Sequence, residues 1–342
     1  MDAHEELVLR IATRQRKQLG LSSAGYGELL IAVRNDPKHF VDSPEDEAMA
    51  LMAKALKQYN DSRGGDDLLD DAEYMQARTR RMARMRRDCA EALAIDRNCI
   101  DAHLCDIIAS DAEPDALLDL LLPLEADAEK LLGPHLQEAS RPAGLGVEAG
   151  QVDEIISVPD DLWNDVFARP LLRVRATMAR AYFDAARYRL ACAEALGTID
   201  LSPLDLLGAR HTAALAYARL EDEQGFESLD ARFGRRGNAW QSLARIILLF
   251  KLGRPGAARR ALHGFDQLCE GGVYALLRPI LIDTYMPDRP AIAPYSFEEA
   301  TLAVHEADPI IVDVPDLLAW VESQEDMAAS ALRFARRSGF DW

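Results

Sequence analysis

Apolar residues recur at steps of three and four positions along the stretch from Pro170 to Leu268, which is the pattern of amphipathic helices. The pattern breaks and restarts at short intervals. Each segment carries its apolar residues on one side only, so a single helix has nothing to bury that side against. We therefore expect consecutive helical hairpins that are stabilised by stacking on one another.

Three hairpins fit this stretch, at residues 170–203, 207–233 and 240–268. Their starts lie about 35 residues apart, the period that helix-turn-helix repeats show. The composition is rich in alanine and leucine and lacks the alternating runs of β-branched residues that strands need. The expected fold class is therefore all-α.

The first hairpin has small residues, aromatic residues and a closing proline where the tetratricopeptide repeat has them, at Ala179, Tyr182, Ala186, Tyr188, Ala191 and Pro203. It resembles that repeat, although the turn position, usually glycine, is Ala186. A wider stretch, residues 88–300, is similar to a bacterial group of tetratricopeptide-like proteins and, through it, to the suppressor-of-tumorigenicity family. The matching segments are 91–103, 162–175 and 201–210.

This resemblance implies a right-handed superhelical stack of helical hairpins, a tetratricopeptide-like α-solenoid. The expected organisation is an N-terminal helical segment (1–62), a long helix with degenerate repeats (66–145), the regular repeats (155–281), and a connector with capping helices (282–342). Glycine and proline mark the breaks at Ser62–Asp67, at Arg141–Gly150 and after residue 281. The resemblance implies a binding scaffold and carries over no catalytic residue.

The sequence also predicts where several individual helices start and end. Ser43, followed by Pro44, is expected to cap a helix, and residues 72–96 are expected to form one long helix. Pro114 and Pro123 are expected to interrupt the helices of that region. Ser296 is expected to start a helix that ends near His305, with residues 309–315 as a short strand or an extended buried strap.

The net charge of the chain bears on which kinds of partner it can bind. The chain of 342 residues carries 57 acidic and 39 basic residues, a formal net charge of -18. A nucleic-acid surface needs a sustained basic face, so a nucleic-acid partner is not expected. No apolar run of about 20 residues exists to span a membrane. Five cysteines without a Cys-x-x-Cys pair indicate a reducing, cytoplasmic setting.

One dense basic cluster, Arg78–Arg87, stands against this acidic background. It has two interpretations. The arginines form a docking face for an acidic partner or RNA, or they pair with nearby acids of the same protein, which is the commoner role of such residues.

Chemistry-bearing residues give no active-site pattern. Cys99 and His103 share a helical face, but Cys105 falls on another side and no fourth ligand is near, so neither a metal site nor a cofactor is expected. The histidines are scattered outside any Ser/His/Asp or Cys/His motif. We therefore expect a protein without enzymatic activity.

The leading helices of the hairpins carry a set of basic and aromatic residues. In a tetratricopeptide-like stack these helices line the concave groove, where the residues would bind an extended, acidic peptide or a C-terminal carboxylate. The candidate peptide-binding residues are Arg173, Arg180, Phe183, Arg210, His211, Tyr217 and Arg245. In the alternative interpretation, Arg173 and Arg210 pair with acids such as Asp184 or Asp205 and lock neighbouring hairpins together.

Two functions follow from these observations. The first is a non-catalytic adaptor that binds a protein or peptide segment in its groove. The alternative is a helical regulatory or enzymatic domain that binds a small molecule in a cleft between the two halves. The oligomeric state and the identity of the partner are left open by the sequence.

Overall fold

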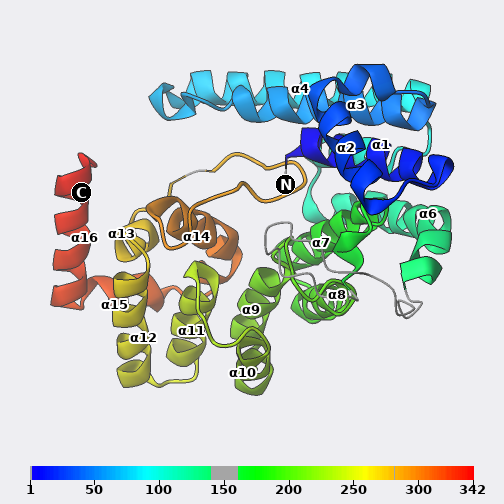
Figure 1. Cartoon of the computed structure of the whole chain (residues 1–342). Helices are drawn as coiled ribbons and strands as arrows, with labels where there is room; N and C mark the ends of the chain where they lie inside the picture. Colours follow the sequence, from blue (N-terminus) through cyan, green and yellow to red (C-terminus); the bar gives the residue numbers. More distant parts are fainter. Residues whose placement is uncertain (1, 140–160, 281) are drawn as a thin grey trace. The chain divides into compact units, whose positions relative to one another are not determined.

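The computed structural model describes residues 2–139, 161–280 and 282–342 (Figure 1). Within these residues it contains sixteen α-helices, three short 3-10 helices and no strand. The prediction of an all-α fold is confirmed. The chain divides into two compact units: unit 1 comprises Met1–Met178, Asp200–Leu207 and Tyr285–Arg289, and unit 2 comprises Ala179–Ile199, Gly208–Thr284 and Pro290–Trp342.

Unit 1 is a series of helices in which each packs against its neighbours in sequence. Contacts join α1 to α2 and α3, α3 to α4, α4 to α5, and α5 to α6. The helices are α1 (Ala3–Leu19), α2 (Ser23–Asn35), α3 (Pro44–Asp61), α4 (Asp71–Ile95), α5 (Ile100–Ala109), α6 (Pro114–Ala139) and the first turns of α7 (Arg169–Asp184), with 3-10 helices at Pro37–Phe40, Asp66–Leu68 and Leu162–Asn164.

Local signals start the helices of unit 1 where the sequence places them. The Ser43 hydroxyl accepts a hydrogen bond of 3.2 Å from the backbone N–H of Asp46, with Pro44 at the first helical position of α3. Asp70 and Glu73 form a reciprocal capping box at the start of α4. The predicted Ser43 cap and the predicted long helix are both confirmed.

Unit 2 contains the remaining helices, with the last turns of α7. They are α8 (Tyr188–Leu201), α9 (Ala209–Leu220), α10 (Glu223–Arg232), α11 (Ala239–Lys251), α12 (Pro255–Leu268), α13 (Gly272–Leu277), α14 (Phe297–Ile311), α15 (Asp316–Glu322) and α16 (Glu325–Ser338). The hairpins α9–α10 and α11–α12 match the second and third predicted hairpins. Their leading helices, α9 and α11, also pack against each other.

The turn of the first hairpin depends on an alanine in a left-handed conformation. Ala186 has φ +57°, and the N–H of the next residue, Arg187, donates a hydrogen bond of 2.8 Å to the carbonyl of Tyr182. This arrangement satisfies a carbonyl at the end of α7 that would otherwise lack a partner. Ala186 therefore adopts a left-handed conformation that glycine takes more easily.

Pro114 lies at an interruption of the helices, as predicted, because α5 ends at Ala109 and Pro114 is the first residue of α6. Two other proline-based predictions are wrong. Pro123 lies inside α6 without ending it. Residues 309–311 are neither strand nor strap, because α14 continues through Pro309 to Ile311. Burial explains the continuation: Ile310 and Ile311 are buried, and their packing offsets the backbone hydrogen bond that proline lacks. The predicted break at Arg141–Gly150 lies outside the described residues.

Candidate functional site

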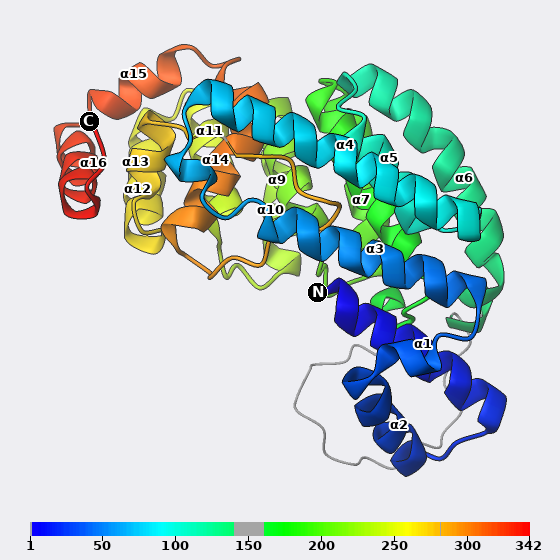
Figure 2. The ribbon, with the colours of Figure 1, turned by 90° about the horizontal axis from the view of Figure 1, so that it is seen from above.

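Part of the side of α9 and α11 that was expected to face a ligand, around His211 and Trp240, is covered by a helix of the same chain. Helix α14 packs against α11, α13 and α9 (Figures 1 and 2). We call this covered side the leading-helix face. Ten of the residues of α14 are buried: Glu299, Ala300, Thr301, Leu302, Ala303, Val304, Glu306, Ala307, Ile310 and Ile311. The small residues among them allow a close approach of the helices.

Glu306 is the centre of the contacts between α14 and its surroundings in unit 2. The side chain is only 1% exposed, and its Oε2 accepts a hydrogen bond of 2.8 Å from the indole Nε1 of Trp240. The guanidinium of Arg180 donates a hydrogen bond of 2.8 Å to the Glu306 carbonyl and lies 3.9 Å from its Oε2. Arg180 also pairs with Asp184 at 2.8 Å. The buried carboxylate thus accepts a hydrogen bond from an indole and has an arginine within ion-pair distance.

Glu299 lies two turns earlier on the same face of α14. Burial raises the pKa of Glu299, while hydrogen bonds from the backbone of Tyr295 and Ala239 and the charge of Arg210 oppose that rise. The guanidinium of Arg210 also lies 4.7 Å from the centre of the Phe233 ring. Two of the predicted groove arginines, Arg180 and Arg210, are therefore close enough to act on glutamates of α14.

The other predicted groove residues of unit 2 take different positions. His211 is buried and stacks on Trp240 with 4.1 Å between the ring centres. Phe183 is fully buried and meets Tyr188 of α8 edge to face, at 5.3 Å. Tyr217 packs so closely on α10 that a Cβ at Gly225 would overlap its ring.

Arg245 also points toward α10. Its guanidinium makes ion pairs with Glu227 and Asp230 at 2.7 and 2.9 Å and lies over the Phe226 ring. Of the seven predicted residues, Arg180, Arg210 and His211 therefore gather around α14 and Trp240. Phe183, Tyr217 and Arg245 pack instead against the trailing helices.

Arg173 belongs to unit 1 and is buried in an ion network. Its guanidinium donates to Glu6 at 3.0 Å, to Asp101 at 3.1 Å and to Asp288 at 2.9 Å. Arg10 bridges Glu6 and Asp101, and Arg169 lies 3.7 Å from Glu6. The network joins α1, α5, α7 and the segment 285–289, so Arg173 connects distant segments of unit 1. The alternative interpretation expected it to pair instead with acids such as Asp184 or Asp205, between neighbouring hairpins.

The basic cluster of α4 is engaged mainly with acids of its own unit. Arg78 pairs with Asp111 at 2.6 Å, and Arg86 pairs with Asp106 at 3.0 Å. Arg81 is buried and pairs with Asp66 at 2.7 Å. These contacts support the structural interpretation of the cluster.

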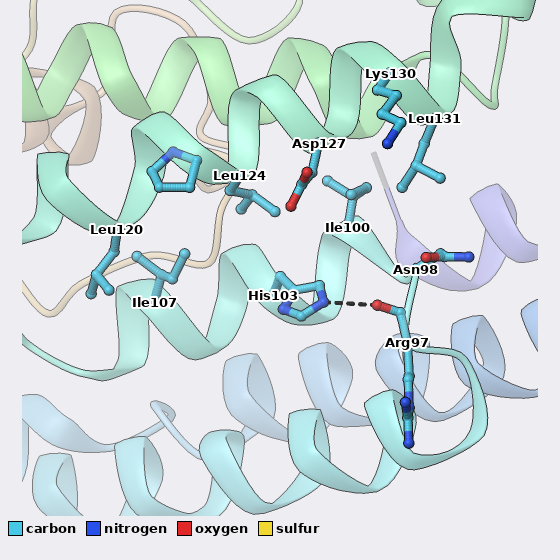
Figure 3. A pocket seen from close by; sticks show the side chains of 11 residues that line it. Arg97, Asn98, Ile100, His103, Ile107, Leu120, Leu124, Asp127, Lys130 and Leu131 are labelled. Carbon is cyan, nitrogen blue, oxygen red and sulfur yellow. Dashed lines mark hydrogen bonds between the residues drawn. The ribbon is translucent and has the colours of Figure 1, made fainter.

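A pocket lies in unit 1 between α5 and α6 and has a volume of about 380 Å³ (Figure 3). Its residues come from the two helices and from the turn before α5: Arg97, Asn98, Ile100, His103, Ile107, Leu120, Pro123, Leu124, Asp127, Lys130 and Leu131. Nε2 of His103 lies 2.9 Å from the carbonyl of Arg97. A carbonyl only accepts, so Nε2 of His103 carries a proton and donates it to this hydrogen bond.

The thiols offer no activated nucleophile. All five cysteines are free and buried. Burial raises the pKa of Cys89, Cys99, Cys192 and Cys269 to about 12, and it raises that of Cys105 as well. A thiol of such high pKa is protonated at neutral pH and reacts slowly.

The described residues contain neither a cluster of metal-binding side chains nor a membrane-spanning helix. Within residues 2–139, 161–280 and 282–342, no three histidine, cysteine or acidic side chains lie close enough together to bind a metal ion. In the same residues, no helix combines the length and the apolar character needed to traverse a bilayer.

Sequence reasoning missed the role of α14, although a signal was present. Glu299 and Glu306 are seven residues apart, and Ala300, Ala303 and Ala307 follow the same helical period. This pattern predicts a helix with one acidic, small-residue face, which suits close packing on a basic neighbour. Comparisons of the chain with protein-family models, with curated proteins and with solved structures found no match.

Proposed function

We propose that the chain is a non-catalytic interaction scaffold of the tetratricopeptide-like kind, which binds an acidic helical segment of a partner on the leading-helix face of unit 2. In this proposal the helical hairpins form a superhelical stack, and α14 occupies the leading-helix face when no partner is bound. A partner segment that is acidic and helical like α14 displaces α14 and binds in its place.

The packing order of unit 2 supports the scaffold. The leading helices α9 and α11 contact each other, and each also packs against its own trailing helix. Repeat scaffolds are built from this pairing of neighbours, in which each repeat buries its apolar face against the next. The extended row of leading helices is the surface such proteins use for binding.

The observation that carries the proposal is the environment of Glu306. Arg180, selected from the sequence as a contact for an acidic ligand, donates to the main-chain carbonyl of Glu306 and lies 3.9 Å from its carboxylate, to which Trp240 donates. The groups that an acidic helical ligand requires are therefore present, and the chain's own acidic helix uses them.

A labelled peptide of residues 296–312 tests the proposal. Fluorescence anisotropy would measure its binding to the full chain and to the variant Glu306→Gln, in which the resident helix is held less tightly. We expect weak binding to the wild type, because the tethered helix competes at high effective concentration, and at least tenfold tighter binding to Glu306→Gln.

Two further variants locate the binding. Arg180→Gln, combined with Glu306→Gln, should abolish the gain in peptide affinity. Arg245→Gln is the matched control, because its guanidinium faces α10 and its loss should leave the gain unchanged. Circular dichroism checks that every variant is folded. Equal affinity of the peptide for the wild type and for Glu306→Gln would refute exchange with α14.

A further inference from the structure

The pocket between α5 and α6 has the shape of a binding site that opens to solvent. Ile100 and Leu124 are buried at its base, while Leu120 and Leu131 are 46% and 40% exposed. The volume of about 380 Å³ lies in the range of about 300 to 1,000 Å³ that small-molecule sites occupy. A ligand that covered the two leucines would remove apolar surface from water, which favours binding.

The apolar residues form two rows along the pocket. Ile100 and Ile107 lie on α5, and Leu120, Leu124 and Leu131 lie on α6. The close-up shows Ile107 and Leu120 together at one end of the pocket (Figure 3). An aliphatic group of a ligand would be received at that end.

The charged residues occupy the other part of the pocket. Asp127 and Lys130 extend from α6 toward α5, whereas the guanidinium of Arg97 points away from the pocket (Figure 3). Asp127 and Lys130 are three residues apart on one helix, yet neither pairs with the other or with any other residue in the described part of the chain. The pocket thus offers one carboxylate and one ammonium group to a ligand.

His103 also lines the pocket, and its Nε2–H is used by the Arg97 carbonyl. Asp127 is an acceptor suited to a ligand's ammonium group, and Lys130 is a donor suited to a carboxylate. A fatty acid or a phosphate ester would satisfy Lys130 alone and be repelled by Asp127.

We propose that this pocket binds a small aliphatic zwitterion, either a free aliphatic amino acid or a short peptide of such residues. The ammonium group of the ligand pairs with Asp127, its carboxylate pairs with Lys130, and its side chain lies against Ile107, Leu120 and Leu124. The site lies wholly in unit 1, so it stands independently of peptide binding in unit 2.

Isothermal titration calorimetry and ligand-observed NMR with the full chain test this proposal. The probes are leucine, the dipeptide Leu-Leu, 4-methylpentanoate, which lacks the ammonium group, and 3-methylbutylamine, which lacks the carboxylate. We expect leucine or Leu-Leu to bind at least tenfold more tightly than either single-charge analogue. The tighter of the two zwitterions shows whether the free amino acid or the peptide is the better ligand.

Three substitutions on α6 assign the contacts. Asp127→Asn should weaken zwitterion binding about tenfold but strengthen the binding of 4-methylpentanoate, because the repulsion from the Asp127 carboxylate is lost. Lys130→Gln should weaken the zwitterion but not the amine. Asp119→Asn is the control, because Asp119 is exposed on the same helix and does not line the pocket. Either of two results overturns the proposal: no zwitterion binding at about 10 mM, or equal binding by all three variants.

Discussion

The indole of Trp240 in α11 donates a hydrogen bond of 2.8 Å to the carboxylate of Glu306 in α14, and both side chains are buried. Trp240 also stacks on His211 of α9. Trp240 thus connects the two leading helices to the helix that covers them. Among the described residues, no other indole donates to a carboxylate, so a substitution at Trp240 removes this kind of hydrogen bond alone.

Trp240→Phe should destabilise unit 2. The substitution keeps an aromatic ring but leaves the buried carboxylate of Glu306 without its indole donor, and we expect a loss of about 1 to 3 kcal/mol in the free energy of unfolding. Urea denaturation followed by circular dichroism measures this. Trp320→Phe is the control, because Trp320 is only partly buried, and a loss equal to that of Trp240→Phe would contradict the argument.

Glu6→Gln should destabilise unit 1 in a manner that depends on pH. Burial by itself raises the pKa of Glu6, but the charges of Arg173 and Arg10 outweigh it and hold the pKa below the ordinary value of 4.5. A group whose pKa is lowered by folding stabilises the fold above its unfolded pKa and loses that effect as the pH falls below it. We expect a loss of about 3 to 5 kcal/mol at pH 7.

The measurement for Glu6 is chemical denaturation from pH 7 down to about pH 3. The difference between wild type and Glu6→Gln should narrow as the pH falls through 4.5. Glu5→Gln provides the comparison, since Glu5 forms a partly exposed ion pair with Arg34 and should contribute at most about 1 kcal/mol. A constant difference across this pH range would show that the charge of Glu6 is not the cause.

Gly225→Ala should destabilise the α9–α10 hairpin. A Cβ at this position would overlap the Tyr217 ring and lie 2.8 Å from the Asp222 carboxylate, so both groups must move. We expect a cost of about 1 to 3 kcal/mol in thermal or urea unfolding. Gly264→Ala in α12 should instead raise the free energy of unfolding by about 0.5 to 1 kcal/mol, because no atom lies within 4 Å of the added methyl group.

The cysteines should resist thiol reagents in the folded protein. All five thiols are buried, and burial keeps them protonated at neutral pH. We expect no labelling by a thiol-specific disulfide reagent within minutes at pH 7, and five equivalents of labelling after denaturation. Rapid labelling of one cysteine in the native protein would reveal a reactive site and weaken the case for a non-catalytic scaffold.

The sequence by itself determined the helices. Apolar residues at helical spacing, the caps at Ser43 and Asp70, and the turn at Ala186 act over a few residues, so their effects can be read locally. Pro123 and Pro309 were misjudged because burial of the flanking residues, which depends on distant segments, outweighs the local preference of proline.

Tertiary structure alone decided what each charged side chain does. The spacing of Arg173 and Arg180 on one helix is visible in the sequence, but the partner of Arg173, Glu6, lies 167 residues away and that of Arg180, Glu306, lies 126 residues away. Ion pairs depend on distances in space, and an amphipathic pattern shows which side of a helix is covered without showing what covers it. The acidic occupant of the leading-helix face therefore became identifiable as α14 only when the chain was folded.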